Sequence, residues 1–133
     1  MSAVFGDTFY FLALVNRADE AHARCRQFSE DYRGTVFTTE YVLVEVADAL
    51  AAPAHRVTAA GFIRLLQRHG QIRVVPASEQ LLNRGLALYA DRPDKDWSLT
   101  DCISFVVMQD ASIAEALTGD RHFTQAGFRA ICG

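Results

Sequence analysis

Two acidic residues, Asp7 and Asp120, directly follow short apolar runs, and a glycine precedes each of them. In parallel α/β sheets, ligands bind at the carboxyl ends of strands, beside the point where the strand order reverses. If the two apolar runs are neighbouring strands at that point, both carboxylates face one crevice, and the preceding glycines let the backbone turn sharply. The alternative is that each aspartate only caps the helix that follows it.

A third acidic residue, Glu45, lies in the predicted helix Thr39–Ala51, which is apolar on almost every side. An unpaired carboxylate is costly on such a surface, so Glu45 is expected either to join a functional site or to form a buried salt bridge with an arginine. Asp48, three residues later, is expected to be exposed or to lie behind the site.

The fourth acidic residue, Asp101, follows Ser98 with capping-box spacing, in which the serine caps a helix and the acid bonds back to the serine amide. Asp101 is also spaced with Phe105 and Met108 along one helical stripe, which should face the interior or a cleft. Because a cap normally faces water, we expect Ser98 to cap the helix while Asp101 has a different role.

Convergence of these four carboxylates would require a nearby positive charge. Two like charges about 4 Å apart repel by roughly 4 kcal/mol at an effective dielectric constant near 20. The chain has one lysine, Lys95, and only Arg121 directly follows one of the four acids. Oxygen ligands without a histidine or cysteine cluster favour Mg²⁺ or Mn²⁺ over Zn²⁺, and the natural substrate of such a site carries phosphate.

The elements that position these acids alternate between strands and helices. The predicted strands are Ala3–Phe5, Thr35–Thr38, Ile72–Val75, Ile113–Leu117 and Phe128–Ile131. The predicted helices are Ala18–Tyr32, Thr39–Ala51, Arg56–Arg68, Ser78–Tyr89 and Ser98–Asp110, followed by a short helical turn at Arg121–Gln125. This alternation predicts an α/β fold with three layers, in which helices cover both faces of a parallel sheet of about five strands.

Composition limits the class of protein. The chain has 133 residues, of which 50% are hydrophobic, so residues 1–133 are expected to form a single domain. No apolar run is long enough to cross a membrane and no signal peptide is recognisable, so a cytoplasmic protein is expected. The net charge of −3 argues weakly against a nucleic-acid partner. With the four acids set aside, however, 13 basic residues face 12 acidic ones.

The four acids occur in an order that resembles the PIN-domain ribonucleases, and among them the VapC-type toxins of prokaryotic toxin–antitoxin pairs. The resemblance spans the chain and is carried by GDTFYFLALVNRADEAH, by Glu45, by DWSLTDCISF and by LTGDRHFTQAGF. It implies the strand order 3-2-1-4-5. It also implies that Asp7, Glu45, Asp101 and Asp120 hold one or two Mg²⁺ or Mn²⁺ ions and form the catalytic site, with Asp7 and Asp101 the first ligands.

Three hydroxyl residues, Thr8, Thr118 and Ser98, are expected to support the acids, and the first two match family positions. The activity implied by the resemblance is metal-dependent hydrolysis of RNA, with a protein antitoxin as partner and no membrane. A homodimer is expected. The helices Thr39–Ala51 and Arg56–Arg68 offer a dimer surface or an antitoxin groove, unless they only pack in the core. Phe9 departs from the family, where many members have a polar residue.

RNA phosphates would contact cations around the site rather than the acids themselves. The candidates are Arg17, Arg92, Lys95, Arg121 and His122, and each is alternatively an ordinary surface charge. Trp97 or Tyr10 would stack on an unpaired base, unless they pack in the core. Packing or solvent exposure is otherwise the expected role of His122, as it is of His22.

Two other functions are consistent with parts of the pattern. A phosphatase or phosphoryl-transfer protein with an aspartate nucleophile usually needs a second acid near Asp7, and Phe9 occupies that place. A PIN-like module that binds RNA or protein without cleavage usually lacks one of the four acids, and all four are present here.

Overall fold

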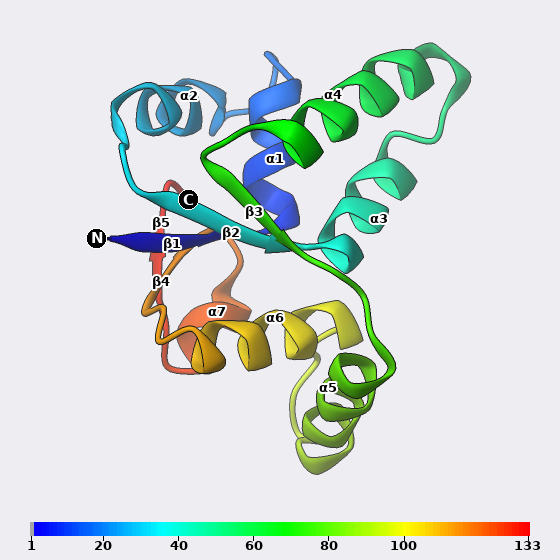
Figure 1. Ribbon diagram of the computed structural model, residues 1–133, viewed down its shortest axis with the longest axis vertical. Helices are drawn as coiled ribbons and strands as arrows, with labels where there is room; N and C mark the ends of the chain where they lie inside the picture. Colours follow the sequence, from blue (N-terminus) through cyan, green and yellow to red (C-terminus); the bar gives the residue numbers. More distant parts are fainter. Residues whose placement is uncertain (1) are drawn as a thin grey trace.

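Five short parallel strands form one sheet in the order β3-β2-β1-β4-β5 in the computed structural model, which describes residues 2–133 (Figure 1). The strands are β1 (Ala3–Gly6), β2 (Thr35–Thr39), β3 (Ile72–Val75), β4 (Glu115–Leu117) and β5 (Arg129–Ile131). β1 pairs with β2 on one side and with β4 on the other, so the strand order reverses at β1. The predicted sheet and its strand order are confirmed.

Helices cover both faces of this sheet. The helices are α1 (Thr8–Val15), α2 (His22–Asp31), α3 (Glu40–Ala49), α4 (Arg56–Arg68), α5 (Glu79–Asp91), α6 (Leu99–Asp110) and α7 (Arg121–Gln125), with a 3₁₀ turn at Pro53–His55. In Figure 1, α1 to α4 lie above the sheet and α5 to α7 lie below it. This is the predicted three-layer arrangement. No helix within residues 2–133 is long and apolar enough to cross a membrane.

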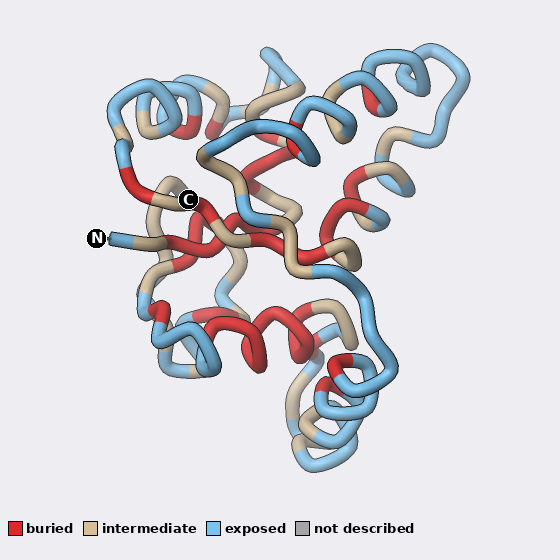
Figure 2. Tube along the Cα trace, viewed as in Figure 1, coloured by how far each residue is buried: buried red, intermediate tan, exposed pale blue. Residues whose placement is uncertain are grey.

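The core lies on both sides of the central strands and is continuous with α6 (Figure 2). Eight consecutive residues of α6, from Asp101 to Met108, are buried. Phe105 of this helix contacts the rings of Trp97 and Phe123 at nearly right angles. Because α6 is buried all around, the acid in its first turn is held on a rigid element.

The main gap in the sequence prediction is α1, for which a start after Asp7 was expected but no range was given. Its sequence, TFYFLALV, has no polar face, so it lacks the periodic pattern that identifies a surface helix. The predicted helix Ala18–Tyr32 begins four residues too early, since α2 starts at His22 after a run of turns. β4 starts at Glu115 and not at Ile113, because Ser112 adopts a left-handed conformation with φ of 55° just before this segment.

Helices α5 and α6 approach each other closely at Gly85. A Cβ atom on Gly85 would lie 2.3 Å from the Cγ1 atom of Ile103 and 3.3 Å from its Cα atom. We expect Gly85→Ala to reduce the free energy of unfolding by about 1–2 kcal/mol, because overpacking outweighs the gain in helix propensity. Chemical denaturation measures this change.

The matched control is Gly61→Ala on α4, where a Cβ atom would meet nothing within 4 Å. This substitution should raise stability by about 0.5–1 kcal/mol, through helix propensity alone. Equal effects at the two glycines would contradict the close α5–α6 contact.

Candidate active site

Asp7 lies at the carboxyl end of β1, beside the end of β4. Its amide donates a 3.3 Å hydrogen bond to the carbonyl of Leu117, and its side chain is only 5% exposed. Although Asp7 occupies the N-cap position of α1, its carboxylate makes no capping hydrogen bond. Instead, Asp7 Oδ2 accepts a 2.9 Å hydrogen bond from the hydroxyl of Thr118. The capping explanation therefore does not account for Asp7.

Thr118 connects two of the four acids. While its hydroxyl donates to Asp7, the same oxygen accepts a 3.0 Å hydrogen bond from the amide of Asp120. Thr118 is fully buried at the end of β4, so its side chain has little freedom to move. It fixes the spacing between the first and the last acid.

Asp101 acts as a cap and also reaches the site. Its Oδ2 atom accepts from the Ser98 amide at 3.1 Å, and its amide donates to Ser98 Oγ at 3.0 Å, which completes the capping box. The same Oδ2 atom lies 2.9 Å from Nδ1 of His122. Capping and a place in the site were expected to exclude each other because a cap usually faces water, but Asp101 is only 7% exposed and combines the two roles.

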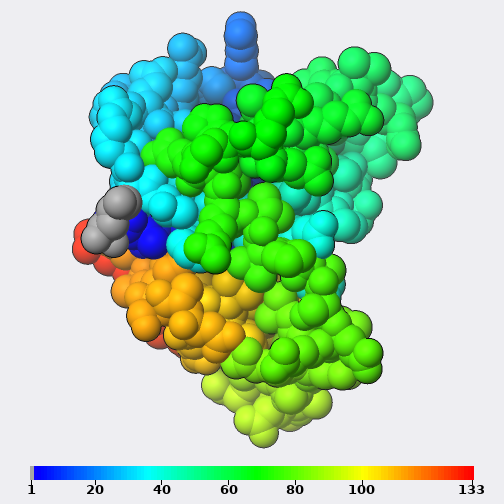
Figure 3. Space-filling model, viewed as in Figure 1, coloured from blue at the N-terminus to red at the C-terminus, as the bar shows by residue number. Residues whose placement is uncertain are grey.

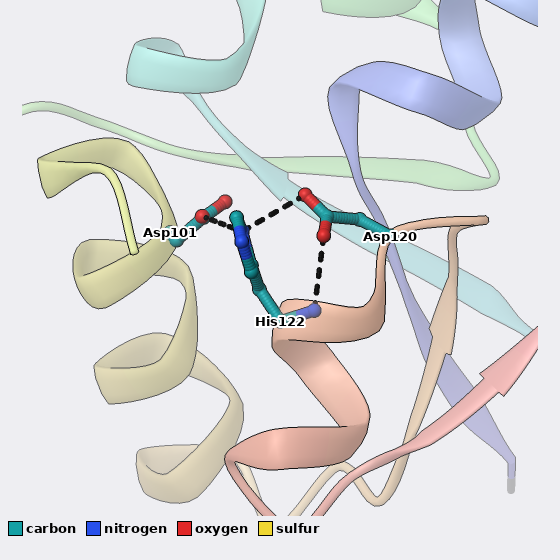
Figure 4. A group of neighbouring side chains, drawn as sticks. All are labelled: Asp101, Asp120 and His122. Atoms are coloured by element: carbon teal, nitrogen blue, oxygen red, sulfur yellow. Dashed lines mark hydrogen bonds and ion pairs between the residues drawn. The ribbon is translucent and has the colours of Figure 1, made fainter. Parts of the chain in front are cut away.

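Asp120 caps α7 and also faces His122. Its Oδ1 atom accepts from the His122 amide at 2.9 Å, and its Oδ2 atom lies 3.1 Å from His122 Nδ1. Figure 4 shows the imidazole ring between the carboxylates of Asp101 and Asp120. On the other side of the ring, Nε2 lies 3.1 Å from Asp96.

Glu45 reaches the same place from α3. Its Oε1 atom accepts a 2.5 Å hydrogen bond from the hydroxyl of Thr8, the first residue of α1. Within residues 2–133 no arginine forms an ion pair with Glu45, so the salt-bridge alternative fails in the part of the chain that the structure describes. Asp48 is exposed, as expected for an acid outside the site.

The four acids share one pocket of about 320 Å³ at the carboxyl edge of the sheet. Its lining consists of Asp7, Thr8, Phe9, Glu45, Asp96, Ser98, Asp101, Gly119, Asp120 and His122. The structure thus brings together the four acids and two of the three predicted supporting residues, and the third, Thr118, lies directly behind the pocket.

The glycines before Asp7 and Asp120 have a different role from the predicted one. Neither has the positive φ of a glycine-dependent turn, which among the described glycines occurs at Gly127. Instead, a Cβ atom on Gly119 would lie 2.6 Å from the ring of Phe9, and one on Gly6 would lie 2.7 Å from the ring of Phe11. The missing side chains make room for aromatic rings beside the pocket.

Burial and mutual repulsion disfavour the charged forms of the acids. Burial raises the pKa of Asp7 from 3.8 to about 7, and the charges of Asp101 and Glu45 add to this, against hydrogen bonds from Thr118 and the Thr8 amide. Burial also raises the pKa of Asp101, although its hydrogen bonds with Ser98 and His122 oppose the shift. Without a cation, the pocket therefore favours a protonated Asp7 near neutral pH.

His122 is the residue that sequence reasoning underestimated. Partial burial lowers the pKa of its imidazole, but the hydrogen bond with Asp101 and the charges of Asp120 and Asp96 outweigh this, so the net shift is upward. A signal was present in the sequence, because His122 lies in the first turn of a helix that Asp120 caps, next to the capping carboxylate. The contacts of His122 with Asp101 and Asp96 come from tertiary structure, so the sequence alone did not reveal them.

The donor set suits a divalent cation. One ligand atom each from Asp101, Asp120 and His122 lies within 4.8 Å of the others, and the carboxylates of Asp7 and Glu45 line the same pocket. Carboxylate oxygens are the preferred ligands of Mg²⁺ and Mn²⁺, and the four site carboxylates outnumber the one imidazole in this pocket. A cation would lower the pKa of Asp7 by stabilising its ionised form.

The predicted cations around the site differ in position. Arg121 pairs with Asp96 at 3.3 Å beside the pocket, and Lys95 lies in the segment before α6. Arg92 stacks on the indole of Trp97 at 5.2 Å and pairs with Asp94. Arg17 is exposed after α1 and does not line the pocket.

The two aromatic residues proposed to stack on a base are not free to do so. Tyr10 is 3% exposed and packs against Phe11 and Phe28. Trp97 is 6% exposed, with its face under Arg92 and its edge against Phe105. Both are therefore core residues, which was the alternative considered for them in the sequence.

Comparison with known proteins shows which family this chain resembles along most of its length. The model of the PIN domain matches residues 4–129. The 23S rRNA-specific endonuclease VapC20, from two strains of Mycobacterium tuberculosis, is 29% identical over 127 residues, which cover 94% of this chain and 95% of the relative.

Solved structures share the same fold. A crystal structure of Mycobacterium tuberculosis VapC20, described as a sarcin-ricin loop cleaving toxin, has a TM-score of 0.86 at 24% identity, covering 96% of both chains. FitAcB from Neisseria gonorrhoeae has a TM-score of 0.66 at 14% identity, with 96% of this chain and 95% of that chain covered. A toxin–antitoxin complex from Klebsiella pneumoniae has a TM-score of 0.59 at 15% identity, with 89% and 87% covered. With its family match, strand order and acidic pocket taken together, the chain belongs to the PIN-domain family.

Proposed function

We propose that this protein is a divalent-metal-dependent endoribonuclease and the toxin of a VapC-type toxin–antitoxin pair. The observation that carries the proposal is the pocket at the β1–β4 edge, where four carboxylates from four separate segments converge in a PIN domain. The relatives named as endonucleases support the same activity.

Asp7, Glu45, Asp101 and Asp120 would hold one or two Mg²⁺ or Mn²⁺ ions. A bound cation supplies a water of lowered pKa and neutralises charge on the phosphodiester. The hydroxyls of Thr118 and Thr8 orient Asp7 and Glu45, so that the carboxylates are positioned before the substrate arrives. None of the acids needs to act as a covalent nucleophile.

Ribosomal RNA is the first substrate to test, because the relative VapC20 is named for its specificity toward 23S rRNA. Such an enzyme would act in the cytoplasm. A protein antitoxin is the proposed partner, since one structural neighbour is a toxin–antitoxin complex and another is described as a toxin. Support within this chain comes from an apolar groove of about 610 Å³ between α3 and α4, which Arg56 and Arg64 border and where Val57 is 88% exposed. We also propose that the protein forms a homodimer.

The test is incubation of purified protein with end-labelled total RNA in Mg²⁺, in Mn²⁺ and in chelator. Discrete fragments that require the metal and carry 5′-phosphate and 3′-hydroxyl ends would support the proposal. Retention of RNA without fragments in either metal would favour a binding module instead.

Loss of the Thr118 hydroxyl should weaken cleavage without changing the shape of the core. Thr118→Val removes both the hydrogen bond to Asp7 and the one from Asp120. We expect cleavage at subsaturating metal to fall by about 10- to 100-fold, the usual effect of removing a group that orients metal ligands. Thr118→Ser, which keeps the hydroxyl, should retain most activity. Equal rates for the two variants in single-turnover assays would contradict this role.

A further inference from the structure

A second hollow of about 860 Å³ adjoins the acidic pocket. The segment from the end of α5 to the start of α6 lines this hollow. It shares Asp96 and Ser98 with the acidic pocket, so the two hollows lie side by side. Figure 1 and Figure 3 show α5 and the segment after it at the lower end of the molecule. A polynucleotide with one phosphodiester in the acidic pocket must leave it along an adjoining surface.

Two cations line this groove, Arg92 and Lys95, and Lys95 is the one lysine of the chain. The Arg92 guanidinium is held in place by stacking on Trp97 at 5.2 Å and by two hydrogen bonds of 3.0 and 3.1 Å that it donates to the carboxylate of Asp94. Asp94 is 59% exposed and also lies 3.9 Å from the Lys95 ammonium. A phosphate can replace this exposed carboxylate, because it offers the same pair of acceptor oxygens to the guanidinium.

The acid that lines the groove, Asp96, is already paired. It contacts Arg121 at 3.3 Å and His122 at 3.1 Å, so its charge is directed toward α7 and away from the groove cations. The groove therefore presents two cations to an anionic chain, even though the net charge of the protein is −3.

Tyr89 provides an aromatic surface in the same groove. It lies near the end of α5 and its side chain is 49% exposed, in contrast to the buried Tyr10 and Trp97. Exposed tyrosines in cationic grooves bind unpaired bases by stacking, with little dependence on sequence. Cations for phosphates and a ring for a base are together the chemistry that recognises single-stranded nucleic acid.

We propose that the groove formed by Tyr89, Arg92 and Lys95 binds the single-stranded segment of RNA next to the scissile phosphodiester. Arg92 and Lys95 contact successive phosphates and Tyr89 stacks on a base. This inference rests on the proposed ribonuclease function, and it adds a binding site to it. Of the five cations expected from the sequence to contact phosphates, the groove keeps Arg92 and Lys95 and leaves out Arg17, Arg121 and His122. Stacking on a base is assigned to Tyr89 instead of Trp97 or Tyr10.

The test measures RNA binding in chelator, where metal-dependent cleavage cannot occur. The probe is a fluorescein-labelled single-stranded RNA of mixed sequence, about 12 nucleotides long, which is within the usual site size for such grooves. Anisotropy of the label gives the affinity, and fluorescence of Trp97, the one tryptophan of the chain, reports on the groove itself. The variants are Lys95→Gln, Arg92→Gln and Tyr89→Ala. The matched control is Arg26→Gln, which breaks an exposed ion pair on α2 instead.

Lys95→Gln and Arg92→Gln should each weaken binding several-fold and reduce the slope of log affinity against log salt concentration by about 0.7, the value for one phosphate contact on a single strand. Tyr89→Ala should weaken binding by about 5- to 50-fold without changing this slope. Arg26→Gln should leave both unchanged. Because Lys95 and Tyr89 are not core residues, these two variants test the groove even if Arg92→Gln disturbs the packing of Trp97.

Absence of binding by the parent protein, or parent-like affinity in both Lys95→Gln and Tyr89→Ala, would overturn the groove. These outcomes are distinct from failure of the nuclease proposal. A parent protein that cuts RNA in Mn²⁺ while the groove variants bind normally is a nuclease with another RNA surface. Weakened binding in the variants of a protein that never cuts supports the groove and rejects the nuclease.

Discussion

Replacing Asp7 with asparagine should abolish metal-dependent cleavage and, at the same time, make the metal-free protein more stable. Loss of one carboxylate from the metal site should reduce the cleavage rate by about a thousandfold or more, below what the assay detects, which corresponds to several kcal/mol of transition-state stabilisation. The asparagine amide oxygen can still accept the hydrogen bond from Thr118, so the local structure is kept.

The gain in stability follows from the raised pKa of Asp7. Burial lifts this pKa from 3.8 to about 7, so above neutral pH the folded protein holds an ionised carboxylate in an unfavourable place. A neutral side chain of the same shape removes this cost, which is on the order of 2–4 kcal/mol at pH 8. Thermal unfolding in chelator measures the difference. An Asp7→Asn protein that is less stable than the parent in chelator at pH 8 would contradict the electrostatic account of the pocket.

The second large effect is that a rise in pH should lower the stability of the metal-free protein and raise its metal-dependent cleavage rate. The folded protein binds the Asp7 proton more tightly than the unfolded chain does, because its pKa is raised to about 7 on folding. In chelator, the contribution of Asp7 to the free energy of unfolding therefore decreases as the pH rises from about 4 to about 7, and stays constant above that.

Cation binding requires the ionised form of Asp7, so cleavage should increase over the same range. At subsaturating Mn²⁺ the rate should rise by up to about tenfold per pH unit below pH 7 and then level off. Loss of the proton from His122, whose pKa is also raised, acts in the same direction because it removes a positive charge from the cation site. Single-turnover rates between pH 5.5 and 8.5 measure the profile. Saturating metal should shift it to lower pH, and a profile insensitive to metal concentration would contradict the linkage.

The sequence was sufficient to predict the sheet because the strands are short apolar runs and helical stretches separate them. The helices Arg56–Arg68 and Leu99–Asp110 were predicted within one residue, since both have clear periodicity or a cap. The extent of α1 could not be predicted by the same means, although a helix start after Asp7 was expected, because TFYFLALV is apolar on every side and shows no period. Burial on all sides removes the signal on which such predictions depend.

The site was less predictable than the fold. The convergence of Asp7 and Asp120 follows from the strand order alone, because parallel strands end at the same edge of the sheet. The position of His122 between Asp101 and Asp120 does not, since it depends on how α6 and α7 pack together. The expectation that Asp101 either caps α6 or belongs to the site was also misleading. Its Oδ2 atom accepts the capping hydrogen bond from Ser98 and also contacts His122 in the site. Local sequence predicts hydrogen bonds between residues close together in the chain, such as those of a helix cap. Hydrogen bonds between separate helices depend on tertiary packing, which local sequence does not reveal.

The most direct test of the central claim compares single-turnover cleavage, with Mn²⁺ titrated at pH 8, for the parent, Asp7→Asn, Asp101→Asn and Asp48→Asn. Asp48 is the matched control, because it is an exposed acid on the same helix as Glu45. The pocket predicts that the parent and Asp48→Asn cut with the same dependence on Mn²⁺, while Asp7→Asn and Asp101→Asn show no cleavage at any concentration. Cleavage by all four proteins at equal rates would contradict the assignment of these carboxylates to a metal-dependent nuclease site.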